Sequence, residues 1–108
     1  MKNLDELDPM WEAQKAERLR LGDDLSVARE VEHFAYFRRK ASAVAAAEVL
    51  VDRGFDVAHG RSGLKTHVCA ARSEALEDDD VRRFLAEVVD VVEAHGGTYD
   101  GWGAETSG

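Results

Sequence analysis

The spacing of apolar residues alternates along this chain between the period of a strand and the period of a helix, and the order of these segments limits the fold more than any other feature. Apolar residues at every second position predict a strand, and apolar residues three or four apart predict an amphipathic helix. Glycines separate most of the segments. The expected elements are a helix at 10–21, a strand at 29–37, a helix at 41–52, strands at 55–59 and 64–71, a helix at 79–95 and a strand at 98–105.

After the first helix the order is strand, helix, strand, strand, helix, strand, which is the split βαβ pattern of the ferredoxin-like fold. We therefore predict an α+β protein, a ferredoxin-like βαββαβ sandwich with one antiparallel sheet, two helices on one face and an extra N-terminal helix. In this topology the first strand is central and pairs with the third. Residues 1–24 are predicted to form a helical extension that lies against the domain, and residues 25–108 the domain itself.

The first strand has large apolar side chains on both of its faces. A strand of this kind is covered on both sides, or one side meets a partner. We therefore take Phe34 and Tyr36 as candidate partner contacts. The two predicted faces are Val31, His33, Ala35 and Phe37 on one side, and Glu32, Phe34 and Tyr36 on the other.

The two helices of the sandwich have apolar faces at helical spacing. Between the two middle strands, Gly60-Arg61-Ser62-Gly63 is typical of a hairpin turn. The predicted buried faces are Ala43, Val44, Ala47, Leu50 and Val51 in the first helix, and Val81, Phe84, Leu85, Val88, Val91 and Val92 in the second.

An acidic run, Glu77-Asp78-Asp79-Asp80, stands where the second of these helices begins. Carboxylates at a helix start complement the helix dipole, which explains the run better than a calcium loop would, because the central glycine of such a loop is missing. Asp78, Asp79 and Asp80 are also candidate contacts for a basic partner.

The charge balance is acidic, with 14 Lys and Arg against 22 Asp and Glu and a net charge of −8. This charge disfavours direct contact with nucleic acid, and it favours a basic partner or serves solubility. No apolar run approaches the ~20 residues of a membrane span, and the first residues lack the apolar region of a signal peptide. We predict a cytoplasmic protein without membrane contact.

Four histidines and one cysteine are the only soft metal ligands: His33, His59, His67, His95 and Cys69. His33 and His67 become neighbours if their strands pair, and Cys69 lies on the same face as His67, so a three-ligand site is conceivable. No short-spaced motif supports it, and nothing marks a group that would orient a Cys-His nucleophile. We predict no catalysis, no metal and no cofactor.

Two alternatives stay open beside a protein-binding function. One is a domain that senses a metal or a small ligand on the sheet face around Phe34, Tyr36, His67 and Cys69. The other is a homodimeric structural module that pairs sheet faces.

The C-terminal segment places two large aromatic residues, Tyr99 and Trp102, among three glycines and Asp100. Two interpretations remain open. The aromatic side chains pack on the edge of the core while the glycines permit a bulge, or they form an exposed anchor for a partner, since Tyr and Trp are favoured at interfaces. Tyr99, Asp100 and Trp102 are therefore candidate partner-binding residues.

Several segments, taken in order, resemble the RraB family, the regulators of ribonuclease E activity. The most specific is Tyr99-Asp100-Gly101-Trp102-Gly103, which follows a valine-rich helix ending in two glycines. The resemblance covers about Glu12 to Gly103. Its weaker parts are a charged first helix followed by Gly22-Asp23-Asp24, the strand start Val31-Glu32-His33, and an alanine-rich helix that runs into Gly54-Phe55-Asp56-Val57.

This resemblance implies a ferredoxin-like fold and a regulator of RNA turnover that binds protein and does not cleave RNA. The founding members of the family inhibit ribonuclease E by binding its scaffold region. The implied partner is therefore ribonuclease E or a related basic scaffold. A long acidic tail often follows the signature in the family, whereas here it is followed by residues 104–108.

Overall fold

The computed structural model of the chain describes residues 8–107, so residues 1–7 of the predicted extension lie outside the described part, as does residue 108. Each predicted segment overlaps the element found, and the predicted order is confirmed. The elements are α1 (Asp8–Arg20), β1 (Arg29–Phe37), α2 (Lys40–Asp52), β2 (Asp56–Ser62), β3 (Lys65–Glu74), α3 (Asp78–Ala94) and β4 (Thr98–Ala104).

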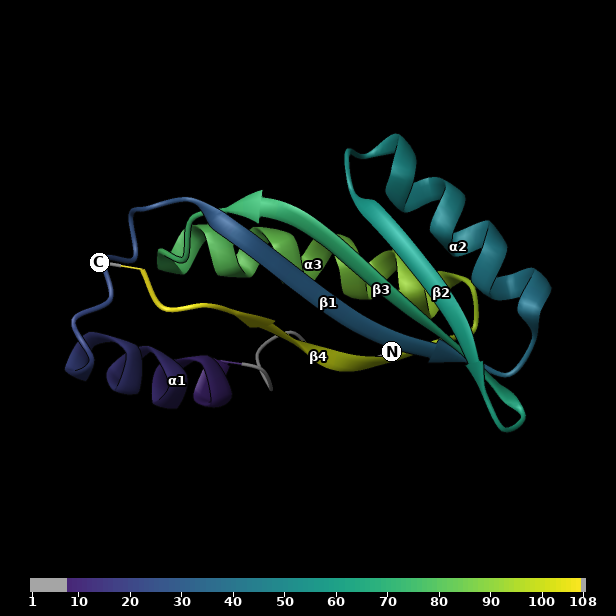
Figure 1. Cartoon of the computed structure of the whole chain (residues 1–108), viewed down its shortest axis with the longest axis horizontal. Coiled ribbons are helices and arrows are strands. Elements are labelled where there is room, and N and C mark those ends of the chain that lie inside the picture. Colours follow the sequence, from purple (N-terminus) through teal and green to yellow (C-terminus); the bar gives the residue numbers. More distant parts are fainter. Residues whose placement is uncertain (1–7, 108) are drawn as a thin grey trace.

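The four strands form one antiparallel sheet in the order β2-β3-β1-β4, with α2 and α3 on one side of it (Figure 1). β1 is central and pairs with β3, as the ferredoxin-like prediction requires. Its side chains alternate as predicted. Val31, His33, Ala35 and Phe37 are buried beneath the helices, while Glu32 and Phe34 lie exposed on the opposite side, called here the open face.

The hairpin between β2 and β3 is tighter than predicted. Ser62 and Lys65 are already paired, so only Gly63 and Leu64 form the turn. Gly63 has φ +61°, while Leu64 has a negative φ, and glycine at the first of two turn positions is typical of a type II′ hairpin. β2 therefore continues through residues that sequence reasoning placed in the turn.

The buried face of α2 is also shifted from the predicted one. Ala46 is fully buried, whereas Val51 is 54% exposed, so the prediction for Val51 is wrong. The small side chains let the helix approach the sheet closely along a narrow stripe, and Val51 lies beyond this stripe. There it lines a shallow hollow with Val57 of the edge strand β2.

Helix α1 lies against the domain, as predicted, and buried side chains join the two. Trp11 is 5% exposed and belongs to the hydrophobic core, and its Nε1 donates a hydrogen bond of 2.9 Å to Asp78. At the other end of the helix, Arg18 is buried and donates to the carbonyl oxygen of Ala104 at 2.9 Å. Trp11 and Arg18 therefore hold α1 beside β4 and the start of α3.

A buried carboxylate ties the loop after α1 to the sheet. The Asp23 side chain is fully buried and forms ion pairs with Arg29 at 2.6 Å and Arg18 at 3.1 Å. Burial raises the pKa of Asp23, but the hydrogen bonds from Arg29 and Arg18 outweigh it, so the pKa lies below its ordinary value. Arg29 also donates to the carbonyl oxygen of Glu105, and this links the end of the chain to the same cluster.

Candidate functional site

A β-bulge in β4 determines where its aromatic residues point. In the pairing with β1, Phe34 lies opposite Gly101 and Ala35 lies opposite Tyr99, so Asp100 is the extra residue. Tyr99 and Trp102 are three positions apart and would face opposite sides of a regular strand. The bulge turns both toward the helix-covered side, which confirms the interpretation that they pack at the edge of the core.

Tyr99 lies inside the protein, only 7% exposed, and does not form the exposed anchor considered above. Its hydroxyl lies 2.9 Å from Nδ1 of His33. Burial raises the pKa of the Tyr99 hydroxyl and lowers the pKa of His33 to about 4, so both groups are neutral at pH 7. Nε2 of His33 is buried and has no hydrogen-bond partner in the described part of the chain.

Trp102 is half-buried and lies within a group of rings. Its ring centroid is 5.1 Å from that of Phe84 and 5.7 Å from that of Trp11. The Arg18 guanidinium lies 5.8 Å from the centre of its indole. Trp102 therefore adds an aromatic contact between the edge strand β4 and helix α1.

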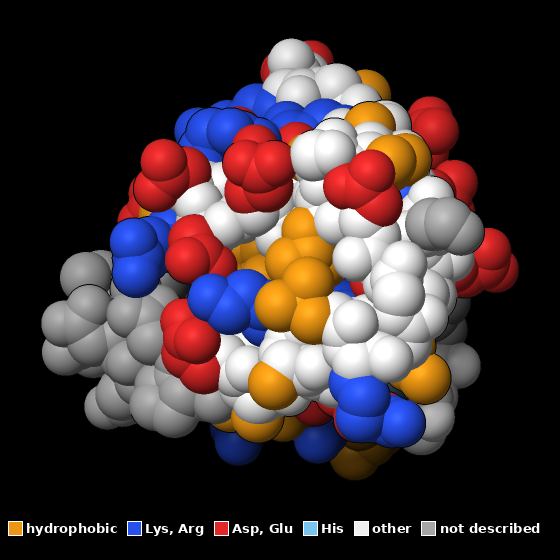
Figure 2. All heavy atoms as spheres, turned by 90° about the vertical axis from the view of Figure 1, so that its left-hand side faces the viewer, with side chains coloured by type: hydrophobic (Ala, Val, Ile, Leu, Met, Phe, Trp, Pro, Cys, Tyr) orange, Lys and Arg blue, Asp and Glu red, His pale blue; other side chains and the backbone are white. Residues whose placement is uncertain are grey.

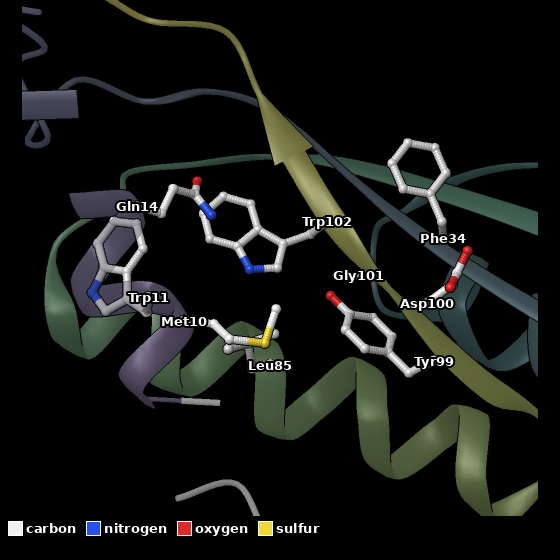
Figure 3. Close-up of a pocket in the computed structure, with 9 residues that line it drawn as sticks. All are labelled: Met10, Trp11, Gln14, Phe34, Leu85, Tyr99, Asp100, Gly101 and Trp102. Carbon is white, nitrogen blue, oxygen red and sulfur yellow. The ribbon is translucent and has the colours of Figure 1, made fainter. Parts of the chain in front are cut away.

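An aromatic pocket of about 430 Å³ opens between α1 and β4 (Figure 3). Proteins bind small ligands and anchor side chains in cavities of about 300–1,000 Å³ with mostly apolar walls. In Figure 3 Met10 points between Trp102 and Tyr99, while Phe34 and Asp100 lie at the end of the pocket away from α1. Its walls are Met10, Trp11, Gln14, Phe34, Leu85, Tyr99, Asp100, Gly101 and Trp102.

The aromatic pocket continues onto the open face across Phe34. This side chain is 41% exposed, because its neighbours in the pairing are Gly101 on one side and the small Cys69 on the other. A second hollow of about 200 Å³ lies beside it and has Phe34, Cys69 and Asp100 among its walls. Phe34 and Asp100 line both the hollow and the aromatic pocket. Tyr36, also on the open face, carries the Lys65 ammonium 4.3 Å from its ring centre.

The histidines and the cysteine do not converge as a metal site would require. His33 lies opposite Ala70 and points into the core, whereas His67 lies opposite Tyr36 on the open face. The predicted neighbourhood of His33 and His67 is therefore wrong, because the strand register places them on opposite sides of the sheet. Residues 8–107 contain no group of three or more His, Cys, Asp or Glu side chains that could hold a metal ion. Burial and the nearby Glu32 raise the pKa of the Cys69 thiol.

The acidic run lies at the other end of the molecule from the β2–β3 hairpin, where α3 begins. Glu77 and Asp80 form a capping box, which confirms the helix-start interpretation, and Asp78 accepts hydrogen bonds from Trp11 and Lys15. Figure 2 shows this end of the molecule, with hydrophobic side chains near the centre of the view and acidic and basic side chains to the left of them and above them.

Of the predicted partner-binding residues, the structure brings Phe34, Tyr99, Asp100 and Trp102 together around the aromatic pocket, with Tyr36 farther along the open face. Asp78, Asp79 and Asp80 line the separate hollow at the start of α3. Sequence reasoning did not assign the walls supplied by α1 and α3, Gln14 and Leu85 among them. The sequence feature that could have indicated the wall from α1 is Trp11, a large aromatic residue on a largely charged helix.

Comparison with known protein families gives a match that covers most of the chain. The family described as "Regulator of ribonuclease activity B" matches residues 15–104. No curated protein matches the chain. Within the described residues, no helix is both long and apolar enough to cross a membrane.

Proposed function

This chain belongs to the RraB family of regulators of ribonuclease activity, and from this premise we propose that it acts without catalysis, by binding a ribonuclease or the scaffold that carries it. The observation that supports binding is the aromatic pocket between α1 and β4, which is open to solvent and continues onto the open face. A partner that buries a large apolar side chain there would gain affinity from a small central region, as interface hot spots do.

The partner we propose is ribonuclease E or a basic scaffold segment related to it, which is the partner implied by the family resemblance. The net charge of −8 supports a basic partner, since opposite charges speed the encounter and exclude wrong partners. The carboxylates at the edge of the aromatic pocket and on the open face supply this charge where the partner would dock.

The test is a titration of the purified chain against ribonuclease E, with binding followed by calorimetry and RNA cleavage measured in parallel. Met10→Glu places a charge at the mouth of the aromatic pocket, where the Met10 side chain is 70% exposed. We expect it to weaken binding by about tenfold or more. Leu19→Glu on the same helix is the matched control, because Leu19 is 55% exposed and does not line the pocket.

Equal binding of ribonuclease E by the Met10 and Leu19 variants would contradict the proposal that the partner binds at the aromatic pocket. Absence of any binding to ribonuclease E, with cleavage unchanged at saturating chain, would contradict the proposed partner.

A second candidate function, recognition of a small apolar molecule, rests on the volume of the same pocket, which lies within the range of small-ligand sites. A ligand that binds the folded state raises its melting temperature in proportion to the logarithm of ligand concentration. A thermal-shift screen of small aromatic compounds tests this function, and Met10→Glu should reduce the shift caused by any compound that binds in this pocket.

A further inference from the structure

We propose that the open face holds an arginine side chain of the partner, with its guanidinium stacked on the Phe34 ring and its N–H groups directed at the Asp100 and Glu32 carboxylates. The inference deepens the proposed function and rests on it for the identity of the partner alone. The chemistry of the site follows from the residues around Phe34.

The Phe34 ring is accessible because β4 offers no side chain to cover it. Gly101 lies directly opposite Phe34 and Gly103 lies opposite Glu32, two positions away on the same face. Apart from each glycine and its two chain neighbours, no atom lies within 4 Å of the position that a Cβ would occupy, so no other side chain covers this part of β4. An exposed aromatic face of this kind attracts a cation.

Carboxylates without cations surround the ring. Asp100 is exposed and shares the walls of both hollows with Phe34, and Figure 3 shows both residues at the same end of the aromatic pocket. Glu32 accepts a weak hydrogen bond from the Cys69 thiol at 3.5 Å, on the other side of Phe34. Neither carboxylate forms an ion pair with any residue of the described chain, 8–107.

The wider open face has the same sign of charge. The pairing register places Glu30 and Asp56 on this side as well, and neither forms an ion pair within residues 8–107. Lys65 in β3 also lies on this face, and its ammonium is already placed over Tyr36. An excess of unpaired carboxylates around an exposed ring predicts a cationic occupant.

The protein contains the proposed arrangement in complete form elsewhere. The Arg72 guanidinium lies 4.0 Å from the centre of the Phe55 ring and donates hydrogen bonds of 2.6 Å to both Glu74 and Glu87. The site at Phe34 has the ring and two carboxylates, and it lacks only the guanidinium. The Arg72 site shows that a guanidinium can stack on a ring of this protein and reach two carboxylates at the same time.

Arginine fits this site better than lysine. Its planar guanidinium stacks on a ring while its N–H donors, which lie in the same plane, reach acceptors at the edges of the ring. An ammonium is a compact charge that is more strongly hydrated and cannot meet two separated carboxylates in one plane.

The experiment uses a blocked arginine-rich peptide as the probe and the full chain labelled for amide NMR. Two matched peptides replace every arginine with lysine or with citrulline, which keeps the shape of the side chain and removes its charge. We expect shifts centred on the amides of β1 and β4 around Phe34 with the arginine peptide. The lysine peptide should bind more weakly, and the citrulline peptide should not bind measurably.

Variants of the chain test the two parts of the site separately. Phe34→Leu keeps an apolar side chain without the aromatic face and should weaken arginine-peptide binding by roughly 2- to 30-fold. Asp100→Asn removes one carboxylate, and it should weaken arginine-peptide binding most clearly at low salt. The matched controls, Leu64→Ala at the exposed hairpin tip and Asp90→Asn on the exposed side of α3, should bind as the unchanged chain does.

Three results would overturn the inference. These are equal binding of the citrulline peptide, unchanged binding by Phe34→Leu, and shifts centred on the acidic hollow at the start of α3. Self-association in light scattering that Phe34→Leu abolishes would also overturn it, because the occupant would then be a second copy of the chain. Peptide binding at Phe34 without binding of ribonuclease E would refute the proposed partner and leave the arginine site standing.

Discussion

Acid should destabilise this protein through His33, whose ring lies in the core between the sheet and α3. The ring is 2% exposed, and it contacts Phe84 and Phe55 edge-on with centroids 5.1 and 5.8 Å away. Burial, and to a smaller extent the positive charge of Arg72, lowers the pKa of His33 from 6.5 to about 4. A protonated ring would also bury an N–H at Nε2, where no partner is present among the described residues.

The size of the effect follows from the two pKa values. The unfolded chain takes up a proton at His33 near its ordinary pKa of 6.5, whereas the folded chain does so only near 4. Protons therefore favour the unfolded state between these values, and stability that is fully present above about pH 6.5 is lost as the pH falls toward 4. The largest loss of unfolding free energy that His33 can cause is roughly 3.4 kcal/mol, and about 2.4 kcal/mol of it occurs between about pH 7 and about pH 4.5.

The assay is urea unfolding at these two pH values for the unchanged chain and for the double variant His33→Leu/Tyr99→Phe. Removing both groups avoids leaving the Tyr99 hydroxyl buried without a partner. Tyr99→Phe alone is the control, because it keeps the histidine. The unchanged chain and the control should each lose about 2.4 kcal/mol more than the double variant on acidification. An equal loss in all three proteins would refute the reasoning.

Four other substitutions test the fold and the site, with the first three measured by denaturant unfolding. Asp23→Asn leaves two buried arginines without their carboxylate and should cost about 3–5 kcal/mol of stability. Trp11→Ala removes a core side chain and should cost about 3–5 kcal/mol, a loss that a dispensable N-terminal extension would not show. Gly97→Ala puts a Cβ into the Phe37 ring and should cost about 1–3 kcal/mol. Gly103→Thr should keep or raise stability, since a β-branched residue suits a strand, while it weakens arginine-peptide binding by covering the surface beside Phe34.

Each of these four expected results is checked by a reference variant or by a contrary result. Gly60→Ala has open space around the added Cβ and should be tolerated, so equal losses at Gly60 and Gly97 would contradict the clash. Asp90→Asn, on an exposed part of α3, is the reference for Asp23→Asn. Unchanged unfolding of Trp11→Ala would favour residues 1–24 as a separate extension. Full peptide binding by Gly103→Thr would show that the surface beside Phe34 is not used.

The fold could be predicted because local signals agreed with one another along the chain. The alternation in β1 and the helical spacing in α3 each identify an element and its buried face, and the order of elements leaves few topologies. The residues that differ from the prediction lie where local pattern has no information. Val51 has the right spacing for the buried face of α2, but its exposure depends on how far the sheet extends beneath the helix.

The candidate site could be predicted only in part, for a similar reason. The Tyr99–Trp102 segment stands out by composition, but the aromatic pocket also needs α1 and α3, whose contacts with β4 join distant parts of the sequence. The pairing of His33 with Tyr99 likewise depends on the register of two strands and on a bulge. A local pattern fixes which face a residue occupies within its own strand, and it does not fix which residue of another strand lies opposite.

The bulge at Asp100 connects the stability of this protein to its proposed binding site. It turns Tyr99 and Trp102 inward, where they complete the core, and the residue it displaces is a carboxylate that remains outside. Gly101 permits this backbone, since it has φ +116°, and Gly101 and Gly103 together leave the Phe34 ring uncovered. At position 103, where the backbone does not require glycine, an edge strand selected for stability alone would carry a β-branched side chain. The core and the site therefore depend on one short segment, residues 99–103, and variants of this segment must be measured for both stability and binding.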